Sequence, residues 1–386
     1  MKFADGISRL GTETAFEVLA KAKKLEAEGK SIIHLQIGEP DFTTPKNICD
    51  AAIKSIQAGD THYTPAAGIP ELRKAISDYV TRTRNVEFSP DNVVMTPGAK
   101  PIMFFVILAL IQAGDEVIYP NPGFPIYESM INFVGGTAVP LRLKQEDNFN
   151  VDIKEFEKLV TDKTKLVIIN TPGNPTGKTI PQADIEAMAE ILKNRDCMIL
   201  SDEIYSRIIY DDAKPFSITK IPGFKDRTII LDGFSKTYAM TGWRAGYGVM
   251  NEELAPVITK LMVNSNSCTN AVTQKACIEA LNGPQDEVDG MLKEFDKRRK
   301  IIVDGLNTIP GFNCTTPDGA FYAFPSIKGT GLTSKEAADK LLYEGGVACL
   351  AGTSFGKYGE GFLRFSYANS IENIQEAIKR IKKVLA

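Results

Sequence analysis

The sequence predicts an α/β protein with a large domain on a mostly parallel sheet, covered by helices on both faces, and a smaller α+β domain. The first observation is length, because 386 residues exceed the ~150 of an average domain. The second is a central alternation of short apolar runs with helical patterns, which is typical of parallel sheets. The third is that both chain ends lack this alternation. Residues 46–280 are therefore expected to form the large domain, and residues 1–45 and 281–386 the small one.

Six apolar runs in the large domain are expected to be strands. Most of them are hydrophobic without interruption, so helices should cover both faces of the sheet that they form. The runs cover residues 92–95, 115–119, 165–170, 198–201, 228–231 and 245–249.

Amphipathic spacing and charge pattern predict the main helices. Helices are expected over residues 15–29, 183–195, 286–307 and 371–385. The first should be closed by Gly29, since glycine suits the left-handed turn that follows many helices. In the third, the basic run Lys297–Lys300 is expected to face solvent, because acidic residues stand beside it.

Charge and hydropathy exclude several function classes. The 45 basic and 48 acidic residues give a net charge of −3, which argues against attraction to nucleic acid or to anionic membranes. The N-terminus lacks the apolar core of a signal peptide. The longest apolar run, residues 101–111, is about half the ~20 residues of a membrane span and should be a buried helix. A cytoplasmic protein is therefore expected.

Neither a metal site nor a disulfide framework is expected. The two histidines, His34 and His62, cannot build a three-histidine metal site, and no catalytic role is expected for them. The six cysteines lie far apart without a Cys-x-x-Cys pair, which indicates reduced thiols. They are Cys49, Cys197, Cys268, Cys277, Cys314 and Cys349.

Ligands of open α/β sheets bind beyond the carboxyl ends of the strands, so the residues after each expected strand are informative. After the first run, Gly98 permits a tight turn and Pro101 suits the first turn of a helix. The free amides of Ala99 and Lys100 would then lie at a helix N-terminus, which favours anions.

Other strand ends carry a rigid loop, an acid and an amine. Residues 170–177 contain two prolines and two glycines, which favour a fixed turn. Asp202 follows an apolar run and needs a cationic partner there. Lys236 is either a surface charge or a Schiff-base lysine. Together with Arg244, eight residues further on, these groups are the parts that hold a phosphorylated aldehyde with a basic ring nitrogen.

Several longer motifs occur in the order found in one family, and the similarity extends over nearly the whole chain. The sequence resembles the fold-type-I pyridoxal-phosphate aminotransferases of class I/II, in the branch that contains bacterial and archaeal aspartate aminotransferases. The motifs are Ile37–Phe42, Tyr63–Gly68, Asn174–Gly177, Asp202–Tyr205, Ser235–Arg244 and Arg364–Ala368.

The resemblance implies pyridoxal 5'-phosphate as the cofactor and assigns residues to it. Lys236 would form the covalent link, and Asp202 would keep the ring nitrogen protonated, so that the ring accepts electrons. Asn174 and Tyr205 would hydrogen-bond the phenolic oxygen of the ring, while Arg244 would bind the phosphate.

Further cofactor contacts follow from the same resemblance. The amides of Ala99 and Lys100 would help to bind the phosphate, and Ser235 is also expected at the cofactor. Phe124 would stack on the ring, at a position where many relatives have tryptophan or tyrosine. Tyr63 would reach the phosphate of the neighbouring subunit, which implies a homodimer with composite active sites.

The resemblance also implies how an amino acid is held. Arg364 would bind the substrate α-carboxylate through a two-pronged hydrogen bond, with help from Gly38 and Asn174. Lys236 would move the Cα proton as base and then acid. The catalytic residues are then Lys236, Asp202 and Tyr205.

The expected activity is ping-pong transamination in amino acid metabolism and biosynthesis, with aspartate and 2-oxoglutarate as the default pair. Alternative donors are alanine, aromatic or other neutral amino acids, and the same motifs also suit a pyridoxal-phosphate C–S lyase or a cyclopropane-forming synthase. A transcription regulator is not expected, because the enzyme-like segment starts close to residue 1.

The sequence leaves the substrate open. Aspartate needs a second cation for its distal carboxylate, and no such residue is identified. Residues 11–14 are acidic and hydroxylated. Glu13 would disfavour aspartate if it faces the site, and would have no such effect if it faces solvent.

Overall fold

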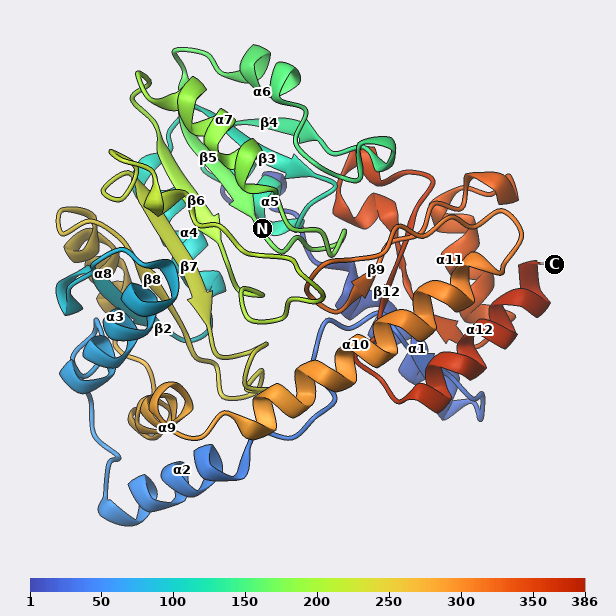
Figure 1. Cartoon of the computed structure of the whole chain (residues 1–386), viewed down its shortest axis with the longest axis horizontal. Helices are drawn as coiled ribbons and strands as arrows, with labels where there is room; N and C mark the ends of the chain where they lie inside the picture. Colours follow the sequence, from blue (N-terminus) through green and yellow to red (C-terminus); the bar gives the residue numbers. More distant parts are fainter. Residues whose placement is uncertain (386) are drawn as a thin grey trace.

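A seven-stranded sheet forms the centre of the molecule in the computed structural model, which describes residues 1–385. Figure 1 shows its strands side by side. Their order is β2-β8-β7-β6-β5-β3-β4, and β8 alone runs antiparallel to its neighbours in this sheet. The strands are β2 (Val93–Thr96), β3 (Glu116–Asn121), β4 (Thr137–Arg142), β5 (Thr164–Asn170), β6 (Met198–Asp202), β7 (Thr228–Gly233) and β8 (Gly246–Val249).

The six expected strands are confirmed to within one or two residues at each end, and the mostly parallel α/β fold is confirmed with them. Strand β4 was not predicted. It lies at the edge of the sheet, contains Pro140 and is mostly half-buried, so it lacks the unbroken apolar run that marks a central strand.

Helices cover both faces of this sheet, as the sequence predicts. In β5, Leu166 and Ile168 pack in the cluster that contains α4, α5 and α8, whereas Val167 and Ile169 pack in the cluster that contains α6 and α7. The helices are α1 (Thr14–Ala27), α2 (Lys46–Ala58), α3 (Pro70–Arg84), α4 (Lys100–Leu110), α5 (Ile126–Phe133), α6 (Ile153–Leu159), α7 (Gln182–Leu192), α8 (Leu254–Ser265), α9 (Ala271–Asn282), α10 (Asp286–Asn307), α11 (Ser334–Tyr343) and α12 (Ile371–Leu385).

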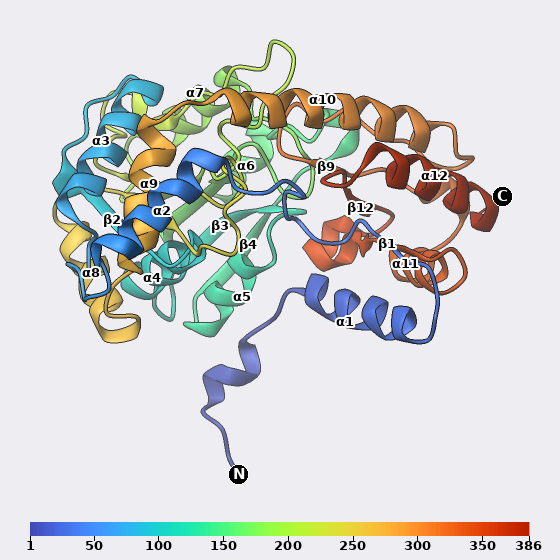
Figure 2. The ribbon, with the colours of Figure 1, turned by 90° about the horizontal axis from the view of Figure 1, so that it is seen from below.

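Two small sheets lie outside the central sheet, and one of them joins the two ends of the chain. Residue Ile33 of β1 pairs in parallel with Val347 of β10, and β11, β12 and β9 form an antiparallel sheet. The strands are β1 (Ile33–His34), β9 (Tyr322–Ala323), β10 (Val347–Ala348), β11 (Leu350–Ala351) and β12 (Leu363–Ser366). Figure 2 shows α1 on the same side of the molecule as α11 and α12. The segment before α1 lies along the end of α5, where Arg9 donates hydrogen bonds to the carbonyl oxygens of Asn132 and Phe133.

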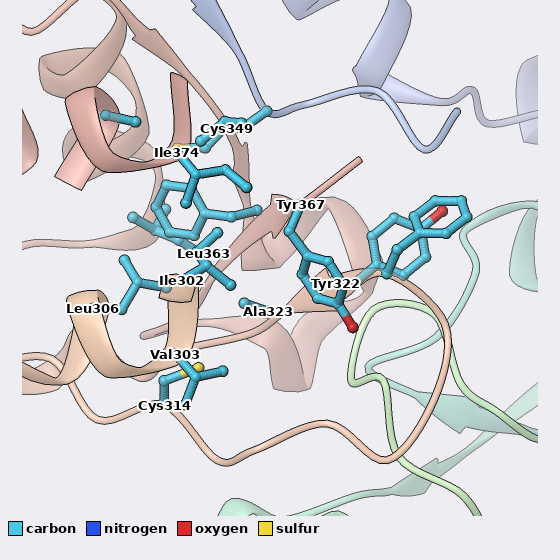
Figure 3. Packing of buried hydrophobic residues seen from close by; sticks show 14 of the residues in the cluster. Ile302, Val303, Leu306, Cys314, Tyr322, Ala323, Cys349, Leu363, Tyr367 and Ile374 are labelled. Carbon is cyan, nitrogen blue, oxygen red and sulfur yellow. The ribbon is translucent and has the colours of Figure 1, made fainter. Parts of the chain in front are cut away.

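Helices α10 and α12 pack over these strands and form the core of this part of the molecule. Figure 3 shows Ile302 and Leu306 of α10 in one cluster with Leu363 and Ile374. Two of the four isoleucines of α12, Ile374 and Ile381, are buried, which agrees with the helical spacing read from the sequence.

The basic run in α10 differs from its expected exposure. Lys297 and Lys300 face solvent, but Arg298 and Arg299 are buried. Arg299 pairs with Asp296 at 2.6 Å and with a second carboxylate, while its guanidinium stacks on an aromatic ring. Long arginine stems pack like apolar side chains, and the acidic partners neutralise the charge.

The structure also bears on the expectations about membrane-spanning helices and cysteines. Within residues 1–385, no helix is both long enough and apolar enough to cross a membrane. All six cysteines are free thiols, and four of them are buried.

Candidate active site

A cavity of about 530 Å³ opens at the carboxyl ends of β5, β6 and β7. Parallel neighbours end at the same edge of a sheet, so the loops after these strands converge there. The segment before α1, the N-terminus of α4 and strand β12 complete the walls. Eleven of the residues predicted from the sequence line this cavity: Gly38, Ala99, Lys100, Phe124, Asn174, Asp202, Tyr205, Ser235, Lys236, Arg244 and Arg364.

The amine of Lys236 lies inside the cavity and donates a hydrogen bond to the carbonyl oxygen of Gly38 at 2.6 Å. Loss of solvent lowers the pKa of Lys236 from 10.5 to about 8, and the positive charge of Arg364 acts in the same direction. At pH 7 roughly one tenth of the amine is therefore uncharged, far more than for a lysine with an ordinary pKa, and an uncharged amine is a nucleophile and a base.

Asp202 lies at the end of β6 with a side chain that is almost fully buried. The hydroxyl of Tyr127 donates to one carboxylate oxygen at 2.5 Å, and the backbone N–H of Ile204 donates to the other at 3.3 Å. Burial raises the pKa of Asp202 to about 6, although both hydrogen bonds act against this rise. No cationic side chain within residues 1–385 forms an ion pair with it.

Two tyrosines lie beside the loop after β5. The hydroxyls of Tyr205 and Tyr322 are 2.6 Å apart, and their rings meet edge to face. Any side chain at Gly38 would overlap the Tyr322 hydroxyl, so this close approach requires glycine. The side-chain oxygen of Asn174 accepts a hydrogen bond from Arg364 at 3.0 Å.

The N-terminus of α4 forms a cradle for an anion. Gly98 has φ +88°, in the left-handed region that favours glycine, and a Cβ there would overlap the guanidinium of Arg244. The backbone of Gly246 in β8 lies directly behind the Ala99 amide. The amides at the start of the helix and the Arg244 charge therefore face one place, together with Ser235.

Arg364 is buried in β12, and no carboxylate of residues 1–385 forms an ion pair with it. One of its terminal nitrogens donates to the Gln36 carbonyl oxygen at 2.5 Å, and the guanidinium stacks on Tyr322 and Phe355 at 4.4 and 4.8 Å. Its Nε has no hydrogen-bond partner in residues 1–385. Burial lowers the pKa of Arg364, and a buried arginine of this kind needs an anion from outside the protein.

Glu13 faces the cavity, which answers the question that the sequence left open. Its carboxylate forms an ion pair with Lys100, whose ammonium also lies 5.4 Å from the centre of the Phe124 ring. The pair joins the segment before α1 to the start of α4 across the cavity wall.

Tyr63 does not reach the cavity of its own chain. It lies in the loop between α2 and α3, and its side chain is 88% exposed.

The sequence reasoning missed Tyr127 and Tyr322. Tyr127 lies in the apolar pattern of α5 and Tyr322 in an aromatic strand, and both patterns are typical of core packing. Each ring contributes a single hydroxyl group to the hydrogen bonds of the site. One polar atom on an aromatic side chain leaves no periodic signal in the sequence.

The chain belongs to the aminotransferase class I and II family, whose model matches residues 30–381. It is 40% identical to an aspartate aminotransferase of Bacillus sp. strain YM-2, with 98% of each chain covered. The structure of the aspartate aminotransferase from Rhizobium meliloti matches with a TM-score of 0.95 at 34% identity, covering 100% of this chain and 99% of that one. An aromatic aminotransferase from Pyrococcus horikoshii matches with 0.90 at 38% identity, over 95% and 98%.

The protein is therefore a pyridoxal-phosphate-dependent transaminase of fold type I that acts on amino acids and 2-oxo acids. The cavity residues fit this cofactor. The cradle at Gly98 suits a phosphate, the unpaired Asp202 suits a protonated ring nitrogen, and the amine of Lys236 suits an aldehyde.

We expect Asp202→Asn to stabilise the protein without cofactor at pH 8. The folded-state pKa of about 6 exceeds the unfolded value of ~3.9. The proton therefore binds the folded state more tightly, and its contribution is complete below pH ~4 and lost as the pH rises through about 6. The two-unit difference corresponds to about 3 kcal/mol of stability that the wild type has lost at pH 8. Asparagine is uncharged at every pH and therefore avoids this loss.

Thermal unfolding of both cofactor-free proteins at pH 8 and pH 4.5 measures this effect. The variant should have the higher melting temperature at pH 8 and approach the wild type at pH 4.5. A lower melting temperature at pH 8, or a difference independent of pH, would contradict the explanation.

Proposed function

We propose that aspartate and 2-oxoglutarate are the substrates of this aminotransferase, and that the predicted cavity residues carry out the reaction. The observation that carries the residue assignment is the buried guanidinium of Arg364, which within residues 1–385 has a free N–H and no carboxylate partner. The aspartate aminotransferase names of relatives at about 40% identity support the substrate pair.

The cofactor would be held at five points. Arg244, the amides of Ala99 and Lys100, and Ser235 would bind its phosphate, which the cradle at the start of α4 supports. Asp202 would accept a hydrogen bond from the protonated ring nitrogen. The remaining points are Lys236 at the aldehyde, Asn174 and Tyr205 at the ring hydroxyl, and Phe124 against the ring face.

The amino acid would be oriented by its α-carboxylate. Arg364 offers the carboxylate its Nε and a terminal nitrogen, while Asn174 and Tyr322 keep the guanidinium in place. The Gly38 carbonyl oxygen accepts a hydrogen bond from Lys236, and the carbonyl oxygen of Gln36, two residues earlier, accepts one from Arg364.

Lys236 would move the proton. Bound pyridoxal phosphate supplies an aldehyde that takes up the amino group and a ring that withdraws electrons from Cα. The Nζ of Lys236, uncharged in part because of its pKa of about 8, would take the Cα proton and deliver it to the carbon of the cofactor's aldehyde group. The Asp202 carboxylate would stabilise the positive charge on the protonated ring nitrogen of the cofactor. The 2-oxo acid acceptor would enter the same cavity after the first product leaves, which makes the route ping-pong.

A homodimer with composite sites is part of the proposal. Tyr63, which is exposed and outside its own cavity, would complete the phosphate site of the partner. Large apolar side chains that a partner could cover support this: Phe3 and Ile7 before α1, and Ile53 and Ile56 on α2, are all at least half exposed.

Two further assignments belong to the proposal. Domain boundaries after residues 45 and 280 are supported by the large sheet, which lies wholly between residues 93 and 249, and by the pairing of β1 with β10. A cytoplasmic location is supported by six free thiols, which reducing compartments maintain.

Neutral amino donors are the second candidate, and Glu13 is the observation that favours them. Lys100 is the cavity cation best placed for a second carboxylate, but Glu13 already neutralises it. The apolar side chains of Phe16 and Ile37 line the same cavity, so an uncharged side chain would fit without breaking the ion pair.

Single-turnover absorbance tests the proposed function. The pyridoxal form is mixed separately with aspartate, glutamate, alanine and phenylalanine, and conversion to the pyridoxamine form is followed. Rapid conversion by aspartate and glutamate supports the proposal, and conversion by neutral donors alone supports the second candidate. Release of ammonia or a thiol without the pyridoxamine form would replace transfer by a lyase reaction.

Lys236→Ala should lose steady-state turnover at least a thousandfold, since the base is removed.

Replacement of Glu13 by glutamine tests the substrate assignment. The change frees Lys100 of its partner at nearly constant shape, so kcat/KM for aspartate should rise several-fold while the value for alanine changes little. Glu17, an exposed acid one turn later on α1, offers the control Glu17→Gln. An equal rise for both donors, or the same effect from the control, would contradict a role for Glu13 in specificity.

Hybrid dimers test the composite site. Tyr63→Ala and Lys236→Ala proteins are unfolded together and refolded as a mixture. If Tyr63 acts across the interface, each hybrid dimer contains one intact site, and activity should exceed that of either parent. Activity no greater than the sum of the unmixed parents would remove Tyr63 from the partner's site.

A further inference from the structure

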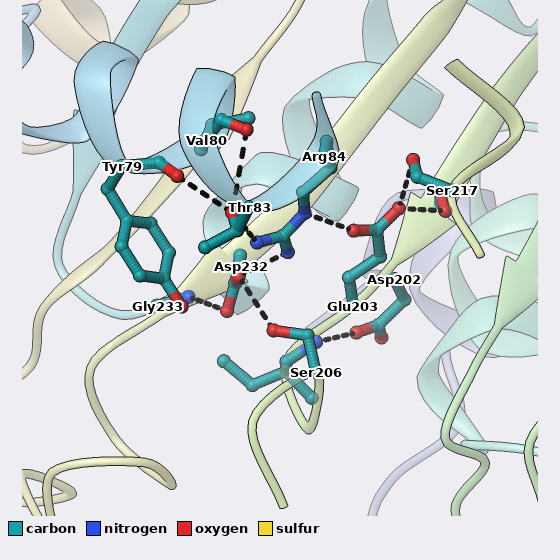
Figure 4. Close-up of polar contacts among 12 residues, drawn as sticks. Tyr79, Val80, Thr83, Arg84, Asp202, Glu203, Ser206, Ser217, Asp232 and Gly233 are labelled. Carbon is teal, nitrogen blue, oxygen red and sulfur yellow. Dashed lines mark hydrogen bonds and ion pairs between the residues drawn. The ribbon is translucent and has the colours of Figure 1, made fainter. Parts of the chain in front are cut away.

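A charged cluster lies beneath the active site and does not line the cavity (Figure 4). Arg84, the last residue of α3, donates from Nε to Glu203 and from one terminal nitrogen to Asp232, both at 2.8 Å. Its other terminal nitrogen donates to the hydroxyl of Thr83 at 2.8 Å. The three charged side chains are each no more than 6% exposed.

The two carboxylates have further hydrogen bonds. Glu203 accepts from the hydroxyls of Ser201 and Ser217 at 2.8 and 2.9 Å. Asp232 accepts from the hydroxyl of Ser206 at 3.3 Å and from the next backbone N–H at 2.7 Å. Packed apolar side chains often stabilise a core as well as such an ion cluster does, so stability alone gives no reason for this one.

The cluster connects the two strand ends that carry the reacting groups. Glu203 directly follows Asp202, and Asp232 lies four residues before Lys236. Strands β6 and β7 are parallel neighbours. Successive residues of an extended chain point to opposite sides, so Asp202 reaches the cavity while Glu203 reaches Arg84.

We propose that Arg84, Glu203 and Asp232 are positioning residues that hold Asp202 and Lys236 at the separation needed to bind pyridoxal phosphate. This inference rests on the cofactor roles proposed above. A planar guanidinium with two fixed N–H directions sets the distance between two carboxylates, which a lysine ammonium does not. The cluster also carries a net charge of −1, which adds negative potential beneath the ring site.

Arg84→Lys keeps the positive charge but removes the planar guanidinium with its two fixed N–H directions. Helix α10 offers a matched control. Arg299 is also buried and paired with two carboxylates, Asp211 and Asp296, but it does not line the cavity. Arg84→Lys and Arg299→Lys therefore make the same chemical change at two buried arginines, of which one connects to the active site.

The readouts are the melting temperature, the dissociation constant of pyridoxal phosphate, and kcat and KM. Both variants should melt at lower temperature. Arg84→Lys should in addition weaken pyridoxal phosphate binding about tenfold or more and lower kcat, with little change in KM for the amino donor. Arg299→Lys should leave the cofactor affinity and kcat at wild-type values. Equal losses in the two variants, or a change confined to melting temperature, would overturn the proposal.

A second pair of variants applies if Arg84→Lys does not fold. Glu203→Gln keeps the shape and removes one negative charge, whereas Ser217→Ala removes a hydrogen bond to the same carboxylate without changing charge. The pH midpoint of the holoenzyme absorbance should fall in Glu203→Gln, because removing a nearby negative charge destabilises the protonated form, and it should stay constant in Ser217→Ala. Unchanged midpoint and cofactor affinity in Glu203→Gln would overturn the proposal. Failure of the wild type to bind pyridoxal phosphate would instead overturn the proposed cofactor roles.

Discussion

Asp202 and Arg364 are both at least nine-tenths buried, and neither forms an ion pair with any side chain of residues 1–385. A lone charge in the protein interior costs several kcal/mol, so the remaining structure has to offset that cost until a ligand supplies the opposite charge. Continuous apolar packing on both faces of the central sheet provides the stability. The site is unfavourable for the empty protein and favourable for an ionic cofactor and substrate.

The same burial tunes the reacting groups. Loss of water lowers the pKa of the Lys236 ammonium and raises that of the Asp202 carboxyl, so the two groups approach each other in acidity from opposite directions. Neither shift needs a special neighbour, since burial is the largest cause in both cases. The parallel arrangement of β5, β6 and β7 therefore sets both the location of these groups and their protonation.

The sequence predicts six strands of the central sheet, several main helices and the cavity edge, because unbroken apolar runs and helical spacing are local signals. It fails where the signal is tertiary. β4 is an edge strand with a proline, and the burial of Arg298 and Arg299 depends on distant acids such as Asp41 and Asp211. Tyr127, Tyr322 and the partner of Glu13 depend on how loops from separate strands meet. The spacing of residues along the chain does not predict these contacts between distant segments.

The pairing of β1 with β10 has a consequence for synthesis on the ribosome. Ile33 meets Val347, so the first strand is made more than 300 residues before its partner. At typical elongation rates this interval lasts tens of seconds. During it the strands of the central sheet emerge in full and can pair, while the apolar face of α1 stays uncovered. That face is covered only once Leu342 and Ala348 have been made, so the last part of the chain to emerge completes the fold around α1.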